Sequence, residues 1–157
     1  MRTHRRTGKA NRRNYSGKHK VHGLLFLAVT DDRGNLLWIS AAKPGRASDI
    51  TAARHNKITA KLRDAGVGAI GDLGFVGLDD DPDDPVIITG KKAARKRPLT
   101  DAQKEANKLV SRERAANEHA FADLKAWRIL AKVRMNARHA TDLLRALLVL
   151  TRLQVTR

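Results

Sequence analysis

The stretch AIGDLGFVG at residues 69–77 joins a short apolar run to one carboxylate and closely spaced glycines. Residues 67–70 are predicted to form a short buried strand. Asp72 follows this strand directly, and functional groups in α/β sheets gather just past the carboxyl ends of strands. Gly71 and Gly74 leave room for another backbone or a ligand. Position alone leaves two interpretations open: Asp72 starts a turn, or it belongs to a functional site.

Further strands are predicted on both sides of this stretch. Two apolar runs within residues 21–42 are joined by the tetrapeptide Asp31-Asp32-Arg33-Gly34, which is a hairpin signal. Residues 85–89 form another apolar run that is typical of a strand. Both runs of the hairpin are apolar nearly throughout, so we expect the sheet to be covered on both faces.

Helical patterns separate and follow these strands. Each predicted helix is recognised by its apolar spacing and by the residues at its ends. The predicted helices run from an N-cap at Ser48 to about Asp64, where Gly66 ends the helix; from Thr100 or Asp101 to Leu130, with a break near Ser111; and over residues 139–154, with Thr141 as N-cap. This order predicts an α/β fold with a mixed sheet flanked by helices.

The charge of the chain points to a polyanionic partner. Its 157 residues include 32 Lys and Arg against 16 Asp and Glu, which gives a formal net charge of +16. Nucleic acid is the usual partner of so basic a protein, and a surface that only maintains solubility is the alternative. Residues 1–20 contain no acid and are expected to be a flexible basic segment.

Composition also excludes several classes of protein. The chain has no cysteine, which excludes disulfides and thiolate metal sites. No apolar run approaches the length of a membrane span, and no apolar segment of a secretory signal follows the basic N-terminus. We therefore expect a cytoplasmic protein without a membrane partner.

Acids are scarce, and two of them stand out. The acidic run at residues 78–85 is expected to be a surface loop, and it lacks the register of a calcium-binding loop. On a helix, Arg114, Glu118 and Lys125 would form one stripe at the edge of the apolar face. The alternative is an ordinary ladder of surface charges. Asp72 and Glu118 together could hold Mg²⁺ or Mn²⁺, which prefer oxygen ligands.

Four blocks of the sequence resemble the catalytic domain of DDE-type transposases of bacterial insertion sequences, which have an RNase H-like fold. The resemblance extends from about Tyr15 to Leu153. Its most specific part is the R-x3-E-x6-K spacing of Arg114, Glu118 and Lys125. The other blocks are YSGKHKVHG at residues 15–23, PGRASDITAAR at 44–54 and GDLGF at 71–75.

The resemblance implies a role for each matching residue. Asp72 would be the second and Glu118 the third metal-binding acid of the catalytic site, with Mg²⁺ or Mn²⁺ as cofactor. Arg114 and Lys125 would contact DNA phosphates near the cleaved bond, and Lys18 and Lys20 are further candidates for such contacts. The implied activity is metal-dependent DNA cleavage and strand transfer on transposon ends and target DNA. A homodimer is one candidate assembly, and the sequence does not reveal the oligomeric state.

The chain departs from the family pattern at its most important point. The first catalytic acid of the family precedes the block at residues 15–23, but the first Asp of this sequence is Asp31, in the predicted hairpin turn. Smaller departures are Ser48 in place of a His, Leu73 and Phe75 in place of Lys and Tyr, and the lack of a Tyr before Arg114.

A site without its first acid should bind metal poorly. We therefore expect residues 21–157 to be an incomplete catalytic domain that lacks its first strand and has impaired or no activity alone. A decayed copy, a misassigned start codon and one half of a split reading frame all fit this expectation. A non-catalytic basic DNA-binding module is the alternative function.

Overall fold

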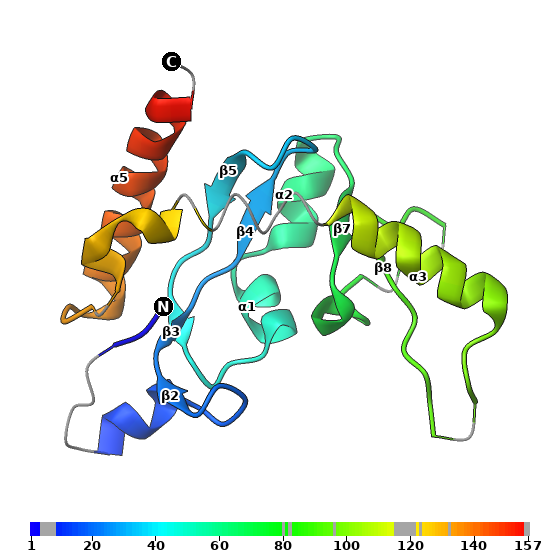
Figure 1. The fold of residues 1–157 in the computed structure, drawn as a ribbon, viewed down its shortest axis with the longest axis horizontal. Helices are drawn as coiled ribbons and strands as arrows, with labels where there is room; N and C mark the ends of the chain where they lie inside the picture. The colour runs from blue at the N-terminus through cyan, green and yellow to red at the C-terminus, as the bar shows by residue number, and fades with distance from the viewer. Residues whose placement is uncertain are drawn as a thin grey trace. The chain divides into compact units, whose positions relative to one another are not determined.

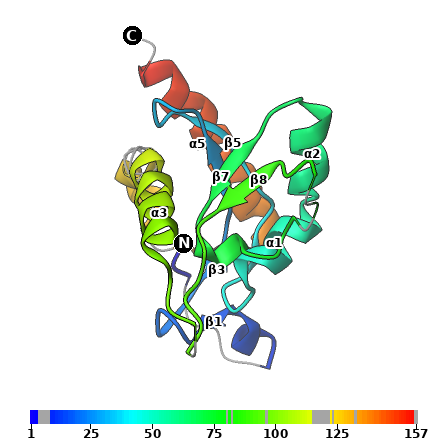
Figure 2. The same ribbon diagram turned by 90° about the vertical axis from the view of Figure 1, so that its right-hand side faces the viewer.

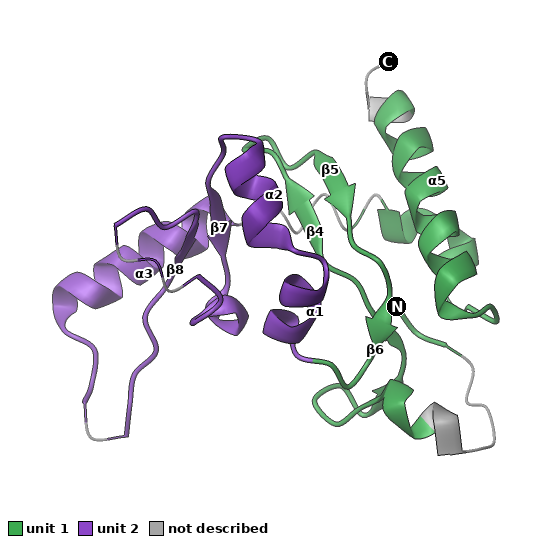
Figure 3. Cartoon of the chain, turned by 180° about the vertical axis from the view of Figure 1, so that it is seen from behind, with its two compact units in different colours: residues 1–47, 116–157 green, residues 48–115 purple. Residues whose placement is uncertain are grey.

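The computed structural model describes residues 1–3, 9–79, 81, 83–95, 97–114, 122, 124–131 and 133–155. The chain forms two compact units, each described by itself (Figure 3). Unit 1 combines residues 1–47 with residues 116–157, and unit 2 comprises residues 48–115. None of the helices in the described part of the chain combines the length and apolarity needed to cross a membrane.

Unit 1 contains three antiparallel strand pairs and a long C-terminal helix (Figure 1). The pairs are β1 with β2, β3 with β6, and β4 with β5. The elements of unit 1 are η1 (Lys9–Asn14), β1 (Tyr15–Ser16), β2 (Val21–His22), β3 (Leu24–Leu25), β4 (Ala28–Thr30), β5 (Leu36–Ile39), β6 (Lys43–Pro44), η3 (Arg128–Leu130) and α5 (Ala137–Val155).

The predicted hairpin at residues 21–42 is confirmed, and its turn is held by side-chain hydrogen bonds. Strands β4 and β5 flank the turn, where Gly34 has a φ of 86°, as the sequence requires. The Asp31 carboxylate accepts from the Asn35 backbone at 2.7 Å and from its side chain at 2.8 Å. The hydrogen bond from the Asn35 side chain is the main reason that the pKa of Asp31 is lowered.

Helix α5 packs its apolar side against this hairpin and forms the core of unit 1. The buried cluster is Leu36, Ile39, Leu124, Leu130, Leu144, Leu147 and Leu148. The prediction of an apolar helix over residues 139–154 is therefore confirmed, but its predicted N-cap is wrong. The helix begins at Ala137, after Asn136 whose side chain accepts from His139 N–H at 2.9 Å. Thr141 instead lies inside the helix, where its hydroxyl accepts from Ala42 N–H at 3.0 Å.

The start of the chain is part of unit 1 and is hydrogen-bonded to β3. The Met1 amino group donates to the Leu24 carbonyl at 2.9 Å, and Leu24 N–H donates to the Met1 carbonyl at 2.8 Å. Burial lowers the pKa of the Met1 amino group, and the nearby Lys125 ammonium lowers it further. Residues 4–8 lie outside the described residues, and the flexibility of residues 1–20 stays a prediction.

Unit 2 contains one parallel strand pair with helices before and after it (Figure 1). Its elements are α1 (Asp49–His55), α2 (Ile58–Asp64), β7 (Ala69–Gly71), η2 (Leu73–Phe75), β8 (Ile87–Thr89) and α3 (Asp101–Glu113). The pairing of β7 with β8 places Ile70 opposite Ile88 and Gly71 opposite Thr89. Both strands are shorter than predicted.

Capping signals located the helix ends of unit 2 well, with one exception. Ser48 accepts from Thr51 N–H at 3.1 Å, and Thr100 forms a capping box with Gln103. The single helix predicted from Ser48 to Asp64 is wrong, because it is broken into α1 and α2. The Asn56 side chain donates to the Ala52 carbonyl at 2.8 Å, and Lys57 has a φ of 52°. Asn competes for helical carbonyls in this way, which explains the break.

The strands of the described residues form four two-stranded sheets, not the one mixed sheet that was predicted. Unit 1 supplies the antiparallel pairs and unit 2 the parallel pair. This mixture of helices and short strands fits the predicted α/β class.

The acidic segment between β7 and β8 is organised by Asp79. Its side chain is only 5% exposed; Oδ2 accepts from Val86 N–H at 2.8 Å, and Oδ1 accepts from the Arg63 guanidinium at 3.0 Å. Burial alone would raise the pKa of Asp79, but these hydrogen bonds from Val86 and Arg63 lower it below its usual range. This acid therefore anchors the connection between the parallel strands.

Lowering the pH should weaken the contacts of the Asp79 carboxylate with Val86 N–H and Arg63. Because the pKa of Asp79 is lower in the folded chain, its stabilisation is complete above its ordinary value of 3.8 and is lost as pH falls through the folded pKa. We expect Asp79→Asn to destabilise the chain at neutral pH and the difference from the parent to shrink on acidification. Urea unfolding from neutral pH down to about pH 3 measures this difference. Asp83→Asn, at an exposed position of the same segment, is the matched control.

Candidate functional site

Asp72 lies at the carboxyl end of β7 and also starts a turn. Its Oδ1 accepts from Gly74 N–H at 2.7 Å, and its carbonyl accepts from Phe75 N–H at 3.0 Å, so Asp72 caps the short helix η2. The carboxylate is 41% exposed. The interpretation of Asp72 as the start of a turn is thus correct. The turn uses Oδ1 of the carboxylate, and Oδ2 does not take part in the hydrogen bond to Gly74.

A second carboxylate lies at the same turn. A Cβ atom built on Gly74 would lie 2.6 Å from Asp49 Oδ2 and 2.7 Å from Asp72 Oδ1. Asp49 is the first residue of α1, so two acids from different elements flank one glycine. Sequence reasoning noted Asp49 only as part of a matching block and assigned it no role. The glycine within GDLGF was the available signal, because a residue without a side chain admits a close neighbour.

Among the described ion pairs, Arg114 is the cation that lies beside the Asp72 carboxylate. Its Nη2 lies 3.6 Å from Asp72 Oδ2, and the two side chains are 36% and 41% exposed. So long and exposed a pair contributes only about 0–1 kcal/mol to stability. The resemblance assigned Arg114 to DNA phosphates; the structure places its guanidinium beside the predicted metal-binding acid.

The described residues do not test whether Glu118 and Lys125 lie beside Arg114, as the predicted stripe requires. Glu118 lies outside the described residues, as do residues 115–117 and 119–121. Lys125 belongs to unit 1, whereas Arg114 and Asp72 belong to unit 2. The predicted helical register between Arg114 and Lys125 therefore stays a prediction.

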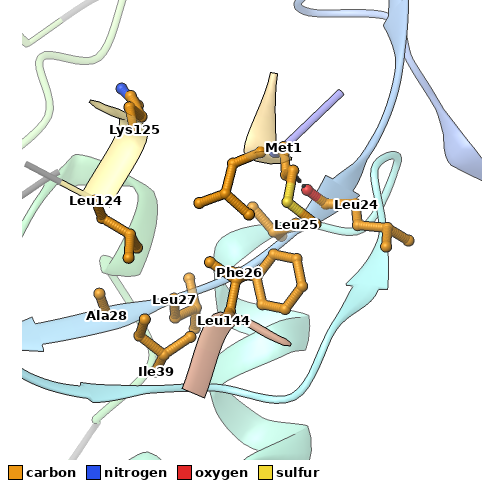
Figure 4. A pocket seen from close by; sticks show the side chains of 11 residues that line it. Met1, Leu24, Leu25, Phe26, Leu27, Ala28, Ile39, Leu124, Lys125 and Leu144 are labelled. Carbon is orange, nitrogen blue, oxygen red and sulfur yellow. Dashed lines mark hydrogen bonds between the residues drawn. The ribbon is translucent and has the colours of Figure 1, made fainter. Parts of the chain in front are cut away.

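Lys125 is an exposed residue beside two hollows of unit 1. One is an apolar cavity of about 330 Å³ between the Leu24–Ala28 segment, Leu124 and Leu144 (Figure 4). In the figure, the ammonium end of Lys125 is turned away from the apolar side chains. The other hollow, of about 550 Å³, is lined by Arg2, His19 and Lys125 among others, and no carboxylate is among its lining residues.

Lys18 and Lys20 lie in the turn between β1 and β2. Both are exposed, and Lys20 has a φ of 51°, a left-handed conformation that is uncommon for a residue with a side chain. Lysines on an exposed turn can reach a phosphate backbone, but nothing in the described contacts assigns them to one.

The described residues alone do not complete a metal site. No group of three or more His, Cys, Asp or Glu side chains within the described ranges is arranged to hold a metal ion. Asp72 offers an oxygen of the kind that Mg²⁺ and Mn²⁺ prefer, so the chemistry of this donor fits the implied ion. A further carboxylate is needed, and Glu118 is the predicted one.

Comparison with known proteins identifies the family of the chain. The model of the family described as DDE superfamily endonuclease matches residues 2–152. Searches of curated proteins and of solved structures find no match.

Gly74 provides a test of the described turn. A methyl group at this position would overlap both carboxylates, and such overpacking costs about 1–3 kcal/mol. We expect Gly74→Ala to lower the free energy of unfolding by this amount in a urea titration. Gly68→Ala is the matched control, because a Cβ there meets only the Val86 carbonyl at 3.7 Å. Equal stability of the two variants would contradict the described packing around Asp72.

Proposed function

The chain belongs to the DDE superfamily endonucleases, and from this we propose that it is a transposase-type protein for metal-dependent DNA cleavage and strand transfer in insertion-sequence transposition. Membership of an endonuclease family implies a DNA substrate. The observation that carries the proposal is the position of Asp72, a half-exposed carboxylate at the carboxyl end of a parallel strand pair with Arg114 beside it. An RNase H-like arrangement of the strands is part of the proposal.

We propose that Asp72 and Glu118 hold Mg²⁺ or Mn²⁺. DDE superfamily endonucleases generally depend on divalent metal, and such ions, when bound, activate a nucleophile and stabilise the leaving oxygen of a phosphodiester. The Gly74 N–H fixes Oδ1 of Asp72, which leaves Oδ2 available to a ligand. Arg114 lies within reach of that oxygen and can contact an incoming phosphate instead.

In the first proposed step, water adds to a phosphorus atom of the DNA backbone and the bond to the 3′ oxygen breaks. The 3′ oxygen takes a proton, which leaves a 3′-hydroxyl and a 5′-phosphate. In the second step the freed 3′-hydroxyl attacks a phosphodiester of the target DNA. One bond between phosphorus and oxygen forms and another breaks, so the number of such bonds is conserved. Arg114 would neutralise negative charge on the phosphate in both steps.

We further propose that the domain takes another strand along the edge of unit 1. Both backbone hydrogen bonds between Met1 and Leu24 lie on one side of the Leu24–Thr30 segment, and Leu27 bonds Ser40 on the opposite side. Because backbone groups alternate along a strand, Phe26 faces the same side as Leu24. No strand within the described ranges pairs with residues 26–29 on that side. The apolar cavity beside this edge (Figure 4) offers space for apolar side chains of such a strand.

Cleavage of labelled DNA that carries the ends of the mobile element tests the proposed activity. We expect cleavage in Mg²⁺ or Mn²⁺ to require both acids, so that Asp72→Asn or Glu118→Gln lowers the rate by at least about 100-fold. The controls are Asp64→Asn, at the exposed end of α2, and Glu113→Gln, at the end of α3. Cleavage unchanged in both acid variants would contradict the assignment of the acids.

A non-catalytic basic DNA-binding module is the second candidate function, favoured by the net charge of +16 and by the hollow lined with Arg2, His19 and Lys125. This function requires DNA binding in the presence of a chelator. The affinity should fall with salt, because each phosphate contact releases a counterion.

Fluorescence anisotropy with a short DNA duplex measures this dependence. We expect the double variant Lys18→Ala, Lys20→Ala to reduce the slope of log affinity against log salt by about two, because each lysine would neutralise one phosphate. The charge-conserving double variant Lys18→Arg, Lys20→Arg should keep the parent slope. An unchanged slope in the alanine variant would remove these lysines from the DNA contact, and negligible binding at low salt would exclude the module.

A further inference from the structure

Helix α3 lies beside the strand pair of unit 2 (Figure 2). The side of the helix that is partly shielded from solvent carries mostly polar residues. Its half-buried residues are Gln103, Asn107 and Val110, followed by Arg114 at its C-cap; no residue of the helix is buried. This spacing defines one face of a helix. Since little apolar surface is buried on this face, specific polar contacts must determine where the helix lies.

Asn107 makes the central contact of this face. Its Oδ1 accepts from Lys91 N–H at 2.8 Å, and its Nδ2 donates to the Lys91 carbonyl at 2.9 Å. One amide side chain thus satisfies both backbone groups of the residue that follows the carboxyl end of β8 by two positions. An amide side chain can accept through its oxygen and donate through its nitrogen at the same time.

Gly90 makes the close approach possible. It is buried, and a Cβ atom at this position would lie 2.8 Å from Asn107 Oδ1 and 3.2 Å from Leu73 Cδ2. A side chain at this position would displace the Asn107 amide from its place beside Lys91.

We propose that Asn107 is a positioning residue, which holds α3 at the strand end so that Arg114 reaches Asp72. Arg114 follows Asn107 by seven residues, which is two turns, and therefore lies on the same face of the helix. The role of Asn107 in catalysis rests on the proposed function, whereas its role in placing α3 rests only on the described contacts.

Spin labels test the placement directly, because the chain has no cysteine to remove. Labels at Glu105→Cys on α3 and Asp64→Cys on α2 both lie on exposed positions of unit 2. The parent should give one narrow distance distribution. Asn107→Ala should broaden or shift it while circular dichroism shows no loss of helix, because Ala favours helix more than Asn. Lys108→Ala, next to it on the exposed side, is the matched control.

Gly90→Ala provides a second and independent variant. It should change the distance distribution as Asn107→Ala does, and it should add little in the Asn107→Ala background, because both act on one contact. A parent-like distribution in Asn107→Ala, or full additivity of the two variants, would overturn the proposal. In an active enzyme, Asn107→Ala should lower kcat with little change in KM for DNA. Failure of that kinetic result alone would count against the proposed function, since the distance measurement does not depend on activity.

Discussion

The parallel pairing of β7 with β8 is the constraint on which the candidate site depends. Because the strands run in the same direction, Asp72 and Gly90 follow them at one edge of the pair. The described residues of the connection between the strands contain no α-helix. The connection is held by the buried side chain of Asp79, through Arg63 and the Val86 backbone. Helix α3 then returns to the same edge. The site is therefore assembled by backbone direction and polar contacts more than by a large apolar core.

Local signals in the sequence predicted much of this fold. Gly34, Ser48 and Thr100 each lie at the turn or cap that their side chains favour, and the apolar spacing of α5 predicted its packing. The predictions of one unbroken helix after Ser48 and of an N-cap at Thr141 were wrong for local reasons. At each place one side chain forms a hydrogen bond that the apolar pattern does not reveal. At Asn56 a side chain competes for a helical carbonyl. Thr141 resembles a cap, but its hydroxyl accepts from Ala42 N–H in the segment between β5 and β6.

The site was predictable only in part. The apolar run before Asp72 and the glycines after it indicated a strand end, and the family match over residues 2–152 agrees with the resemblance. Neither the closeness of Asp49 to Gly74 nor the hydrogen bonds between Asn107 and Lys91 could be predicted. These contacts join separate elements whose packing no spacing in the sequence reveals. Arg114 was expected to contact phosphate; its position beside Asp72 suggests that it also screens the acid when no phosphate is bound.

NMR line broadening by Mn²⁺ tests most directly whether Asp72 and Glu118 form the metal site of a DNA-cleaving domain, because a bound paramagnetic ion broadens only the amide signals near it. We expect broadening centred on residues 71–75 that disappears in Asp72→Asn and weakens in Glu118→Gln. Broadening centred instead on the acidic residues 79–84, and unchanged in both variants, would contradict this assignment of the metal site.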